Sequence, residues 1–234
     1  MSSNTFILAK NEIIYWDIDI EKLESSYFSN LYQHLSDSNK SRSSFFTKEK
    51  DRNLFITAHY ALDFILEKIF QIKPLILIDK NGKPYIKNYP IHFNLSHSEN
   101  RVLLGFSHQP LGVDIEKINA LSDLDLLIAY SLHSDEISSL MALKPNHKIN
   151  LFYSLWTKKE AIVKGIGIGM GMELNSFSLE SLKKDASWQI FELSIDSKYS
   201  AAIATQNTSS SLIGYQLRLP TTELDIRLLS RTNR

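Results

Sequence analysis

The chain of 234 residues contains no cysteine. This absence excludes disulfide bonds, thiolate catalysis and zinc sites built on cysteine. The chain also has no excess charge of either sign, because 26 lysines and arginines balance 26 aspartates and glutamates. Nonspecific binding to nucleic acid needs a basic excess, so we expect no nucleic-acid partner and only a local cluster of cations at any anion site.

Long apolar segments are missing as well. The run Phe6–Ala9 is shorter than the apolar core of a signal peptide. No stretch approaches the roughly 20 apolar residues that a transmembrane helix needs. These patterns predict a cytoplasmic protein with no membrane partner.

Two common catalytic motifs are also absent. Neither a G-x-x-x-x-G-K-[S/T] loop nor a G-x-S-x-G elbow occurs. Glycines do alternate with other residues over Gly165–Gly171, but this run follows a predicted helix and precedes a predicted strand. A dinucleotide-binding fingerprint has the opposite order, so the run predicts either a helix stop or a mobile loop over a site.

Hydrophobic periodicity predicts an α+β fold. Long helices are predicted over residues 48–72 and 148–164, and shorter ones over residues 122–130 and 134–143, the last with Ser134 as its N-cap. Residues 36–44 are polar and predict a loop. Strands are predicted over residues 13–20, 75–78, 85–86, 101–106, 111–116, 176–179, 188–195, 199–205 and 212–219, with 101–106 and 111–116 forming a hairpin.

Four charged residues indicate a site for a metal and a phosphate. Asp114 and Glu116 lie two apart on a predicted strand, so their carboxylates share one face. Glu160 and Lys164 lie four apart on a predicted helix and also share a face. Three carboxylates and a lysine suit a hard divalent cation that holds a phosphate. Lys158 and Lys159 would point to other helix faces, so we expect both to tolerate alanine better than Lys164 does.

Each pair also has a simpler interpretation. Asp114 and Glu116 fit an edge strand with one wet face, and Glu160 and Lys164 fit an ordinary surface ion pair. Trp156 lies one turn before Glu160, which favours a helix face that borders the core over a surface pair.

Ser96 and His97 are candidates for phosphate binding. A hydroxyl, an imidazole and free backbone N–H groups can bind a phosphate, and the alternative is a turn with a solvated histidine. A Ser-His-Asp hydrolase is not favoured, because adjacent serine and histidine cannot supply the geometry of nucleophile and base.

Several of these motifs occur in a set order along the chain. They are Gly82-Lys83-Pro84, Phe93-Asn94-Leu95-Ser96-His97-Ser98, Gly112-Val113-Asp114-Ile115-Glu116, Trp156-Thr157-Lys158-Lys159-Glu160-Ala161 with Lys164, and the glycine run followed by Ser176-Phe177-Ser178-Leu179. In this order and spacing they resemble the 4′-phosphopantetheinyl transferase superfamily, in particular its two-lobed type that activates peptide and polyketide synthases.

The resemblance implies a fold and a division of the chain. The fold would be α+β, with two similar lobes related by a pseudo-two-fold axis, each a small, mainly antiparallel sheet packed on a long helix. Residues 1–108 would form the lobe on the adenylate and 3′-phosphate side of coenzyme A. Residues 109–234 would form the lobe that holds magnesium and the catalytic residues.

The resemblance also implies an enzyme. The serine hydroxyl of an apo acyl or peptidyl carrier protein would attack the β-phosphate of coenzyme A. Phosphopantetheine would move to the serine, adenosine 3′,5′-bisphosphate would leave, and Mg2+ would bridge the pyrophosphate. The enzyme would act as a monomer, with coenzyme A as its co-substrate and the carrier protein as its partner.

Residue roles follow from the same resemblance. Asp114, Glu116 and Glu160 would be the magnesium ligands. Glu160 would also help to remove the serine proton, and Lys164 would contact the pyrophosphate, so the catalytic residues would be Glu160, Lys164 and Asp114. The residues expected to bind coenzyme A are Lys164, Ser96 and His97 at its phosphates, Lys83 and Pro84 beside the adenine and 3′-phosphate, and Arg52.

The first lobe departs from the family pattern. Basic residues before and on the long helix are expected to hold the 3′-phosphate. Lys40, Arg42 and Arg52 lie in this region, but Leu54 and His59 stand where an arginine is expected. Two other functions would use the same site: a metal-dependent phosphoesterase that acts on pyrophosphates like that of coenzyme A, and a non-catalytic module that binds carrier proteins.

Overall fold

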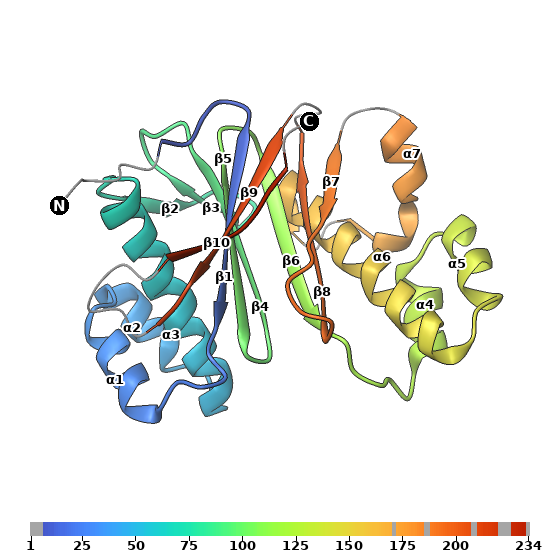
Figure 1. Cartoon of the computed structure of the whole chain (residues 1–234), viewed down its shortest axis with the longest axis horizontal. Helices are drawn as coiled ribbons and strands as arrows, with labels where there is room; N and C mark the ends of the chain where they lie inside the picture. Colours follow the sequence, from blue (N-terminus) through green and yellow to red (C-terminus); the bar gives the residue numbers. More distant parts are fainter. Residues whose placement is uncertain (1–6, 170–171, 185–187, 207–209, 220–225, 233–234) are drawn as a thin grey trace.

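The computed structural model describes residues 7–169, 172–184, 188–206, 210–219 and 226–232. The described part has a mixed α+β fold, as the sequence predicts, with three small sheets and helices packed on them. The largest sheet has the strand order β10-β9-β1-β5-β4 and occupies the middle of the molecule (Figure 1). Its strands are β1 (Glu12–Asp19), β4 (His92–Ser98), β5 (Arg101–Ser107), β9 (Ser211–Leu217) and β10 (Ile226–Thr232).

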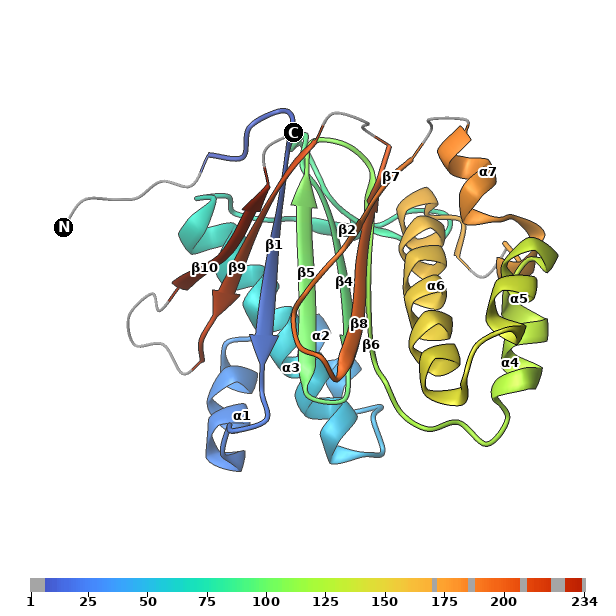
Figure 2. The ribbon, with the colours of Figure 1, turned by 45° about the vertical axis from the view of Figure 1, so that its right-hand side comes forward.

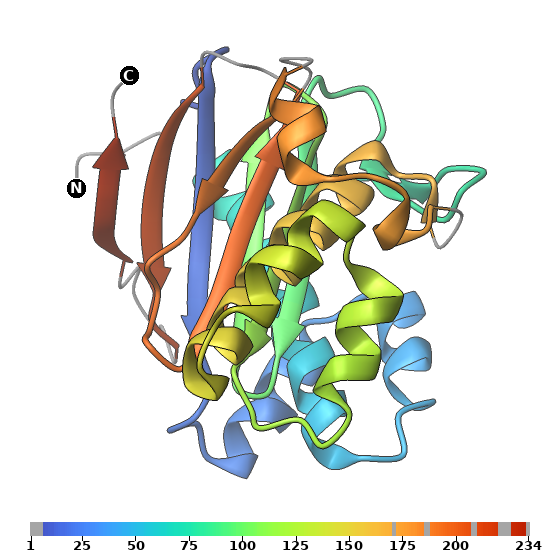
Figure 3. The ribbon, with the colours of Figure 1, turned by 90° about the vertical axis from the view of Figure 1, so that its right-hand side faces the viewer.

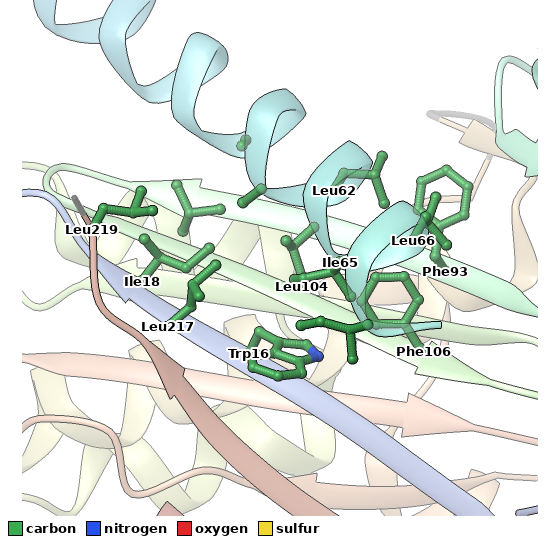
Figure 4. Close-up of a cluster of buried hydrophobic side chains, with 14 of the residues drawn as sticks. Trp16, Ile18, Leu62, Ile65, Leu66, Phe93, Leu104, Phe106, Leu217 and Leu219 are labelled. Atoms are coloured by element: carbon green, nitrogen blue, oxygen red, sulfur yellow. The ribbon is translucent and has the colours of Figure 1, made fainter. Parts of the chain in front are cut away.

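One face of this sheet is covered by α3 (Glu49–Phe64), which continues as a π-helical turn (Ile65–Ile69). The helical periodicity of residues 48–72 therefore gives the predicted helix. Figure 4 shows Leu62, Ile65 and Leu66 directed onto the sheet, where Trp16 and Phe106 are fully buried. These contacts form the main hydrophobic core.

Two short helices precede α3, namely α1 (Ser25–Gln33) and α2 (Asp37–Ser43). The prediction of a loop over residues 36–44 is therefore wrong. The Ser36 hydroxyl accepts a hydrogen bond from the Asn39 backbone N–H at 3.3 Å and caps α2. Polar residues are common both in loops and at helix N-termini, and here they start a helix.

A second layer is formed by a three-stranded sheet and the long helix α6 (Pro145–Ile166). The sheet has the order β6-β8-β7, with β6 (Leu111–Lys117), β7 (Gln189–Glu192) and β8 (Tyr199–Thr205). Helix α6 packs against β6 and β8, and Figure 2 shows α4 (Leu124–Ser131) and α5 (Ser134–Met141) beyond α6. Within the described residues, no helix is long and apolar enough to cross a membrane.

Three predictions for the segments between residues 101 and 184 are wrong. Strands β5 and β6 do not pair with each other as a hairpin, because β5 pairs with β1 and β4 whereas β6 pairs with β8. Residues 176–179 are not a strand: a 3-10 turn (Leu174–Ser176) is followed by α7 (Leu179–Lys184). The N-cap of α5 is His133 instead of Ser134, and Glu136 completes a capping box there.

The two ends of the chain meet in the largest sheet. Strand β9 runs parallel beside β1, and β10 pairs with β9 at the outer edge of the sheet (Figure 3). These strands lie within residues 109–234 of the sequence, yet they extend the sheet that β1, β4 and β5 begin. A small hairpin of β2 (Ile76–Ile78) and β3 (Pro84–Ile86) forms the third sheet, and its turn includes Gly82, which has a φ of 89°.

The close approach of β6 to α6 gives a first prediction, at Gly112. A Cβ atom at this position would lie 2.0 Å from the Ala161 carbonyl oxygen and 2.3 Å from the Gly165 nitrogen. Backbone atoms cannot move aside cheaply, so we expect Gly112→Ala to lower the free energy of unfolding by about 3 kcal/mol, the top of the range for overpacking. Urea denaturation measures this change.

Gly82→Ala is the matched control. No described residue lies within 4 Å of a Cβ added at Gly82, so the opposition to alanine comes from its φ of 89°. We expect a loss of roughly 1 kcal/mol from that backbone strain. A smaller loss for Gly112→Ala than for Gly82→Ala would contradict the close packing of β6 on α6.

Candidate active site

The site lies where the edges of two sheets meet. Strand β4 is an edge of the five-stranded sheet and β6 is an edge of the three-stranded sheet, and the two strands pack together although no ladder joins them. Side chains of β4 make the connection. Asn94 accepts a hydrogen bond from the Val113 backbone N–H at 2.9 Å, Ser96 donates to Asp114 at 3.0 Å, and Ser98 donates to Glu116 at 2.9 Å.

Asp114 is the centre of this contact. It is buried, and its Oδ1 accepts from both the Ser96 hydroxyl and the Lys164 ammonium, the latter at 2.6 Å. Lys164 also donates to the Ser96 oxygen at 3.0 Å. Strand β6 and helix α6 thus bring together two of the predicted residues that lie fifty positions apart, and β4 adds the third.

Glu116 and Glu160 border Asp114. Burial raises the pKa of Glu116 to about 7, with the nearby Asp114 as the second cause. Burial likewise raises the pKa of Glu160, again followed by the effect of Asp114. Each carboxyl is therefore close enough to Asp114 to feel its charge, and Lys164 opposes the shift at both.

A cavity of about 560 Å³ opens beside this group. Glu160 and Lys164 line it from α6, together with Trp156, which confirms that this helix face does not simply face solvent. The β2–β3 turn forms another part of the wall, and residues 172–175 form a third. The lining residues are Asn81, Gly82, Lys83, Pro84, Asn94, Tyr130, Trp156, Glu160, Val163, Lys164, Gly167, Gly169, Met172, Glu173, Leu174 and Asn175.

The carboxylates fit a divalent cation by their chemistry. Asp114 Oδ2 is buried and has no hydrogen-bond partner among the described residues, so it is an unused acceptor beside two further carboxyls. Hard cations prefer such oxygen donors. Among the described residues, however, no group of three or more histidine, aspartate or glutamate side chains is already arranged around a metal position. Lys164 instead donates to one oxygen of Asp114, and Ser98 donates to one oxygen of Glu116.

The pKa of Glu116 gives a second prediction. Its folded value of about 7 exceeds the ordinary 4.5, so the ionised carboxyl is disfavoured in the folded state. The metal-free protein should therefore lose stability through this group as the pH rises from about 4.5 to 7. We expect Glu116→Gln, measured with a chelator present, to raise the urea midpoint at pH 8 and to leave it nearly unchanged at pH 4.5. An equal effect at both pH values would contradict the shift.

Lys83 lines the cavity, but its ammonium is directed at the backbone. It donates to the Gly165 carbonyl at 2.7 Å and to the Leu111 carbonyl at 3.3 Å. Burial lowers its pKa to about 8. Gly167, with a φ of 77°, ends α6 against the Lys83 side chain, which confirms the helix stop. Pro84 lines the same wall.

His97 and Arg52 differ in their surroundings. His97 follows Ser96 and is partly buried, and its pKa is lowered first by burial and then by Lys164. Arg52 is exposed on α3, with its guanidinium 5.6 Å from the centre of the Tyr32 ring. Neither residue lines the cavity.

His59, which stands where the sequence leads us to expect an arginine, lies near enough to His97 and to Arg42 of α2 to be affected by their charge. Its pKa is lowered to about 4, first by burial and then by Arg42 and His97. Arg42 lies 5.1 Å from the centre of the Phe55 ring. The two histidines are therefore mainly uncharged near neutral pH, and the cations of this region are Lys164 and Arg42.

Sequence reasoning missed two contacts of the candidate site. Asn94, Ser96 and Ser98 lie two residues apart along β4, and this period of two could have indicated that all three face the same neighbour.

The expectation that Lys159 tolerates alanine is not supported by its position, because this side chain is fully buried and ion-paired with Glu136.

The part of the chain that carries the acidic residues is similar to proteins of a known family. A family model described as the 4′-phosphopantetheinyl transferase superfamily matches residues 110–212. This match covers less than half of the chain. It confirms the resemblance to this family that the motifs indicate. The transferase match includes Asp114, Glu116, Glu160 and Lys164, and it begins after the predicted residues of β4 and the β2–β3 turn.

Individual transferases are similar to different extents. The 4′-phosphopantetheinyl transferase gsp of Aneurinibacillus migulanus is 41% identical over 108 residues, which are 45% of this chain and 44% of that protein. The 4′-phosphopantetheinyl transferase Sfp of Bacillus subtilis strain 168 is 42% identical over 100 residues, 42% of this chain and 43% of that protein. These matches span less than half the length of either relative. HetI of Nostoc sp. is 27% identical over 211 residues, 84% of this chain and 89% of that protein.

Proposed function

We propose that this protein transfers 4′-phosphopantetheine from coenzyme A to a serine of an acyl or peptidyl carrier protein and releases adenosine 3′,5′-bisphosphate. The observation that carries the proposal is the meeting of Lys164, Asp114 and Ser96 beside a cavity, within and next to the segment that matches the transferase family. Phosphoryl transfer depends mainly on positioning and charge neutralisation, and this group offers both.

Lys164 would neutralise charge on the pyrophosphate of coenzyme A. Its ammonium lines the cavity and is held by Asp114 and Ser96, so it needs little reorganisation when a phosphate arrives. The Ser96 hydroxyl and the His97 imidazole would bind the same phosphates. Asp114, Glu116 and Glu160 would hold Mg2+, which supplies further charge neutralisation when bound.

Glu160 would accept the proton of the carrier serine. A general base works best when its pKa lies near the working pH. Burial and the neighbouring Asp114 raise the pKa of Glu160 in that direction, and its side chain lines the cavity.

The remaining contacts to coenzyme A would come from two regions. Lys83 and Pro84 would border the adenine, with Lys83 keeping the end of α6 in place through its bonds to Gly165 and Leu111. The 3′-phosphate would lie toward the basic residues of the first half of the chain, among them Arg42 and Arg52.

The wider architecture belongs to the same proposal. Residues 1–108 and 109–234 would form two lobes related by a pseudo-two-fold axis, with β4 and β6 as the facing edges. The enzyme would act as a cytoplasmic monomer.

Intact-mass measurement of an apo carrier protein tests the activity. After incubation with the protein and coenzyme A, the carrier should gain the mass of phosphopantetheine when Mg2+ is present and should not when a chelator replaces it. A carrier whose target serine is changed to alanine is the control and should gain nothing.

The same assay separates the two other functions. Hydrolysis of coenzyme A without any carrier would indicate a phosphoesterase. Binding of the carrier without a mass change, tested over carriers of fatty-acid, polyketide and peptide synthesis, would indicate a binding module. Either result would contradict the proposed transfer.

A further inference from the structure

Lys159 is a charged side chain in a fully buried position, one residue before Glu160. Its ammonium donates to the Leu174 and Phe177 carbonyl oxygens, both at 2.8 Å, and pairs with Glu136 at 2.6 Å. An ammonium group has three N–H donors, so these acceptors use all of them. Burial of a charge without such partners would be strongly unfavourable, which indicates that the arrangement is specific.

Glu136 extends this contact to two more helices. Its Oε2 also accepts from the His133 backbone N–H at 3.0 Å, at the start of α5. Its Oε1 accepts from the Leu179 backbone N–H at 2.9 Å, where α7 begins. The Lys159–Glu136 pair therefore joins α6 to the starts of α5 and α7.

The segment held by this pair is a wall of the cavity. Leu174 and Asn175 line the cavity, and Lys159 bonds the carbonyl groups at both ends of the short stretch Leu174–Phe177. Glu160, the next residue along α6, lines the cavity from the helix side. One turn of α6 thus carries a residue of the proposed active site and the anchor of the wall beside it.

We propose that Lys159, paired with Glu136, is a positioning residue that fixes the Leu174–Phe177 wall and thereby sets the affinity of the cavity for coenzyme A. This inference rests on the proposed function and deepens it. Lys159 acts through the wall, since it does not itself line the cavity.

Loss of the anchor should affect binding more than turnover. A wall that is free to move must be ordered when the ligand binds, and this ordering reduces affinity. The charged groups at Lys164 and Asp114 are held by other contacts, from β4 and β6. We therefore expect the KM for coenzyme A to rise roughly tenfold, as ordering of a few side chains would give, with kcat changed little.

Three variants test the proposal. Lys159→Met removes the donors but leaves Glu136 with an unpaired charge. The double variant Lys159→Met with Glu136→Gln removes both charges, so it avoids that penalty while still leaving the carbonyl groups of Leu174 and Phe177 without their donor. Lys158→Met is the matched control, because Lys158 is the neighbouring lysine and pairs instead with Glu192, at 2.7 Å, on β7.

The measurements are backbone hydrogen exchange by mass spectrometry, calorimetric binding of coenzyme A, and transfer kinetics with an apo carrier. In the double variant we expect faster backbone exchange confined to residues 174–179. We also expect a larger Kd and a higher KM for coenzyme A, with a kcat within about threefold of the wild type. Lys158→Met should match the wild type in all three.

Several results would overturn the proposal. These are wild-type exchange at residues 174–179 in the double variant, an unchanged KM, a fall in kcat without a change in KM, or loss of folding in both Lys159 variants. If the wild-type protein neither binds coenzyme A nor transfers phosphopantetheine, the proposed function fails. The exchange comparison with Lys158→Met would still decide whether Lys159 fixes the wall.

Discussion

Lys164→Ala should remain folded but lose on the order of a hundredfold or more of its kcat, even at saturating coenzyme A, because stabilisation of the developing charge would be lost. The ammonium lies 2.6 Å from Asp114 Oδ1 and lines the cavity, so it is held where a pyrophosphate would bind. Were Lys164 only half of a surface ion pair, its loss would cost about 0.3–0.5 kcal/mol and leave activity unchanged. Steady-state transfer to an apo carrier separates these outcomes.

Lys158→Ala is the control on the same helix. Lys158 pairs with Glu192 and Ser154, away from the cavity. From helical spacing alone Lys159 would be a second control, but its full burial and its bonds to Leu174 and Phe177 make it unsuitable. Lys164→Arg should rescue activity only in part, because a planar guanidinium does not replace a compact ammonium. Equal activity of the Lys164 and Lys158 alanine variants would exclude the catalytic role.

The faces of the long elements could be predicted from the sequence because periodicity is a local property. Apolar spacing in residues 48–72 specifies which side of α3 is buried, and Leu62, Ile65 and Leu66 lie in the core as expected. The same reasoning places Glu160 and Lys164 on one face of α6. These statements depend on residues within a few turns of each other, and the structure confirms them.

Pairing between distant segments could not be predicted in this way. The sequence Ser107-His108-Gln109-Pro110 has the composition of a tight turn. Strand β5 nevertheless pairs with β1 as well as with β4, and β6 pairs with β8, so that Ser107 lies opposite Ile13 and Leu111 lies opposite Thr205. The edge contact between β4 and β6 is likewise a tertiary feature. It brings Ser98 onto Glu116 and Asn94 onto Val113, and neither pair is indicated by local spacing.

The direction of a lysine side chain was the least predictable part of the site. Lys83 is implied by resemblance to border a phosphate, and the structure directs its ammonium at the carbonyl groups of Gly165 and Leu111. Lys159 lies in a motif of charged residues that suggests exposure, yet it is buried. A long flexible side chain takes its position from the acceptors that the folded chain provides, and those acceptors are distant in sequence.

Asp114→Asn should also reduce transfer by on the order of a hundredfold or more, while the protein remains folded. Asparagine keeps the shape of the buried side chain and an oxygen for the bond from Ser96, but it removes the charge that Lys164 pairs with and the free acceptor at Oδ2. Loss of that charge should also reduce the repulsion that raises the pKa of Glu116 and of Glu160. Transfer kinetics at several magnesium concentrations measure the loss of activity, and urea denaturation tests whether the protein remains folded.

Asp125→Asn is the matched control for the loss of a carboxylate. Asp125 is an exposed residue of α4 whose partner is Lys148, at 2.5 Å, and neither lines the main cavity. Its variant should keep wild-type turnover at every magnesium concentration. The Asp114 variant should stay slow when magnesium is raised, because the metal would lack one of three ligands and Lys164 would lack its partner. Turnover near the wild-type value at saturating magnesium would exclude Asp114 both as a ligand and as the residue that holds Lys164 for the reaction.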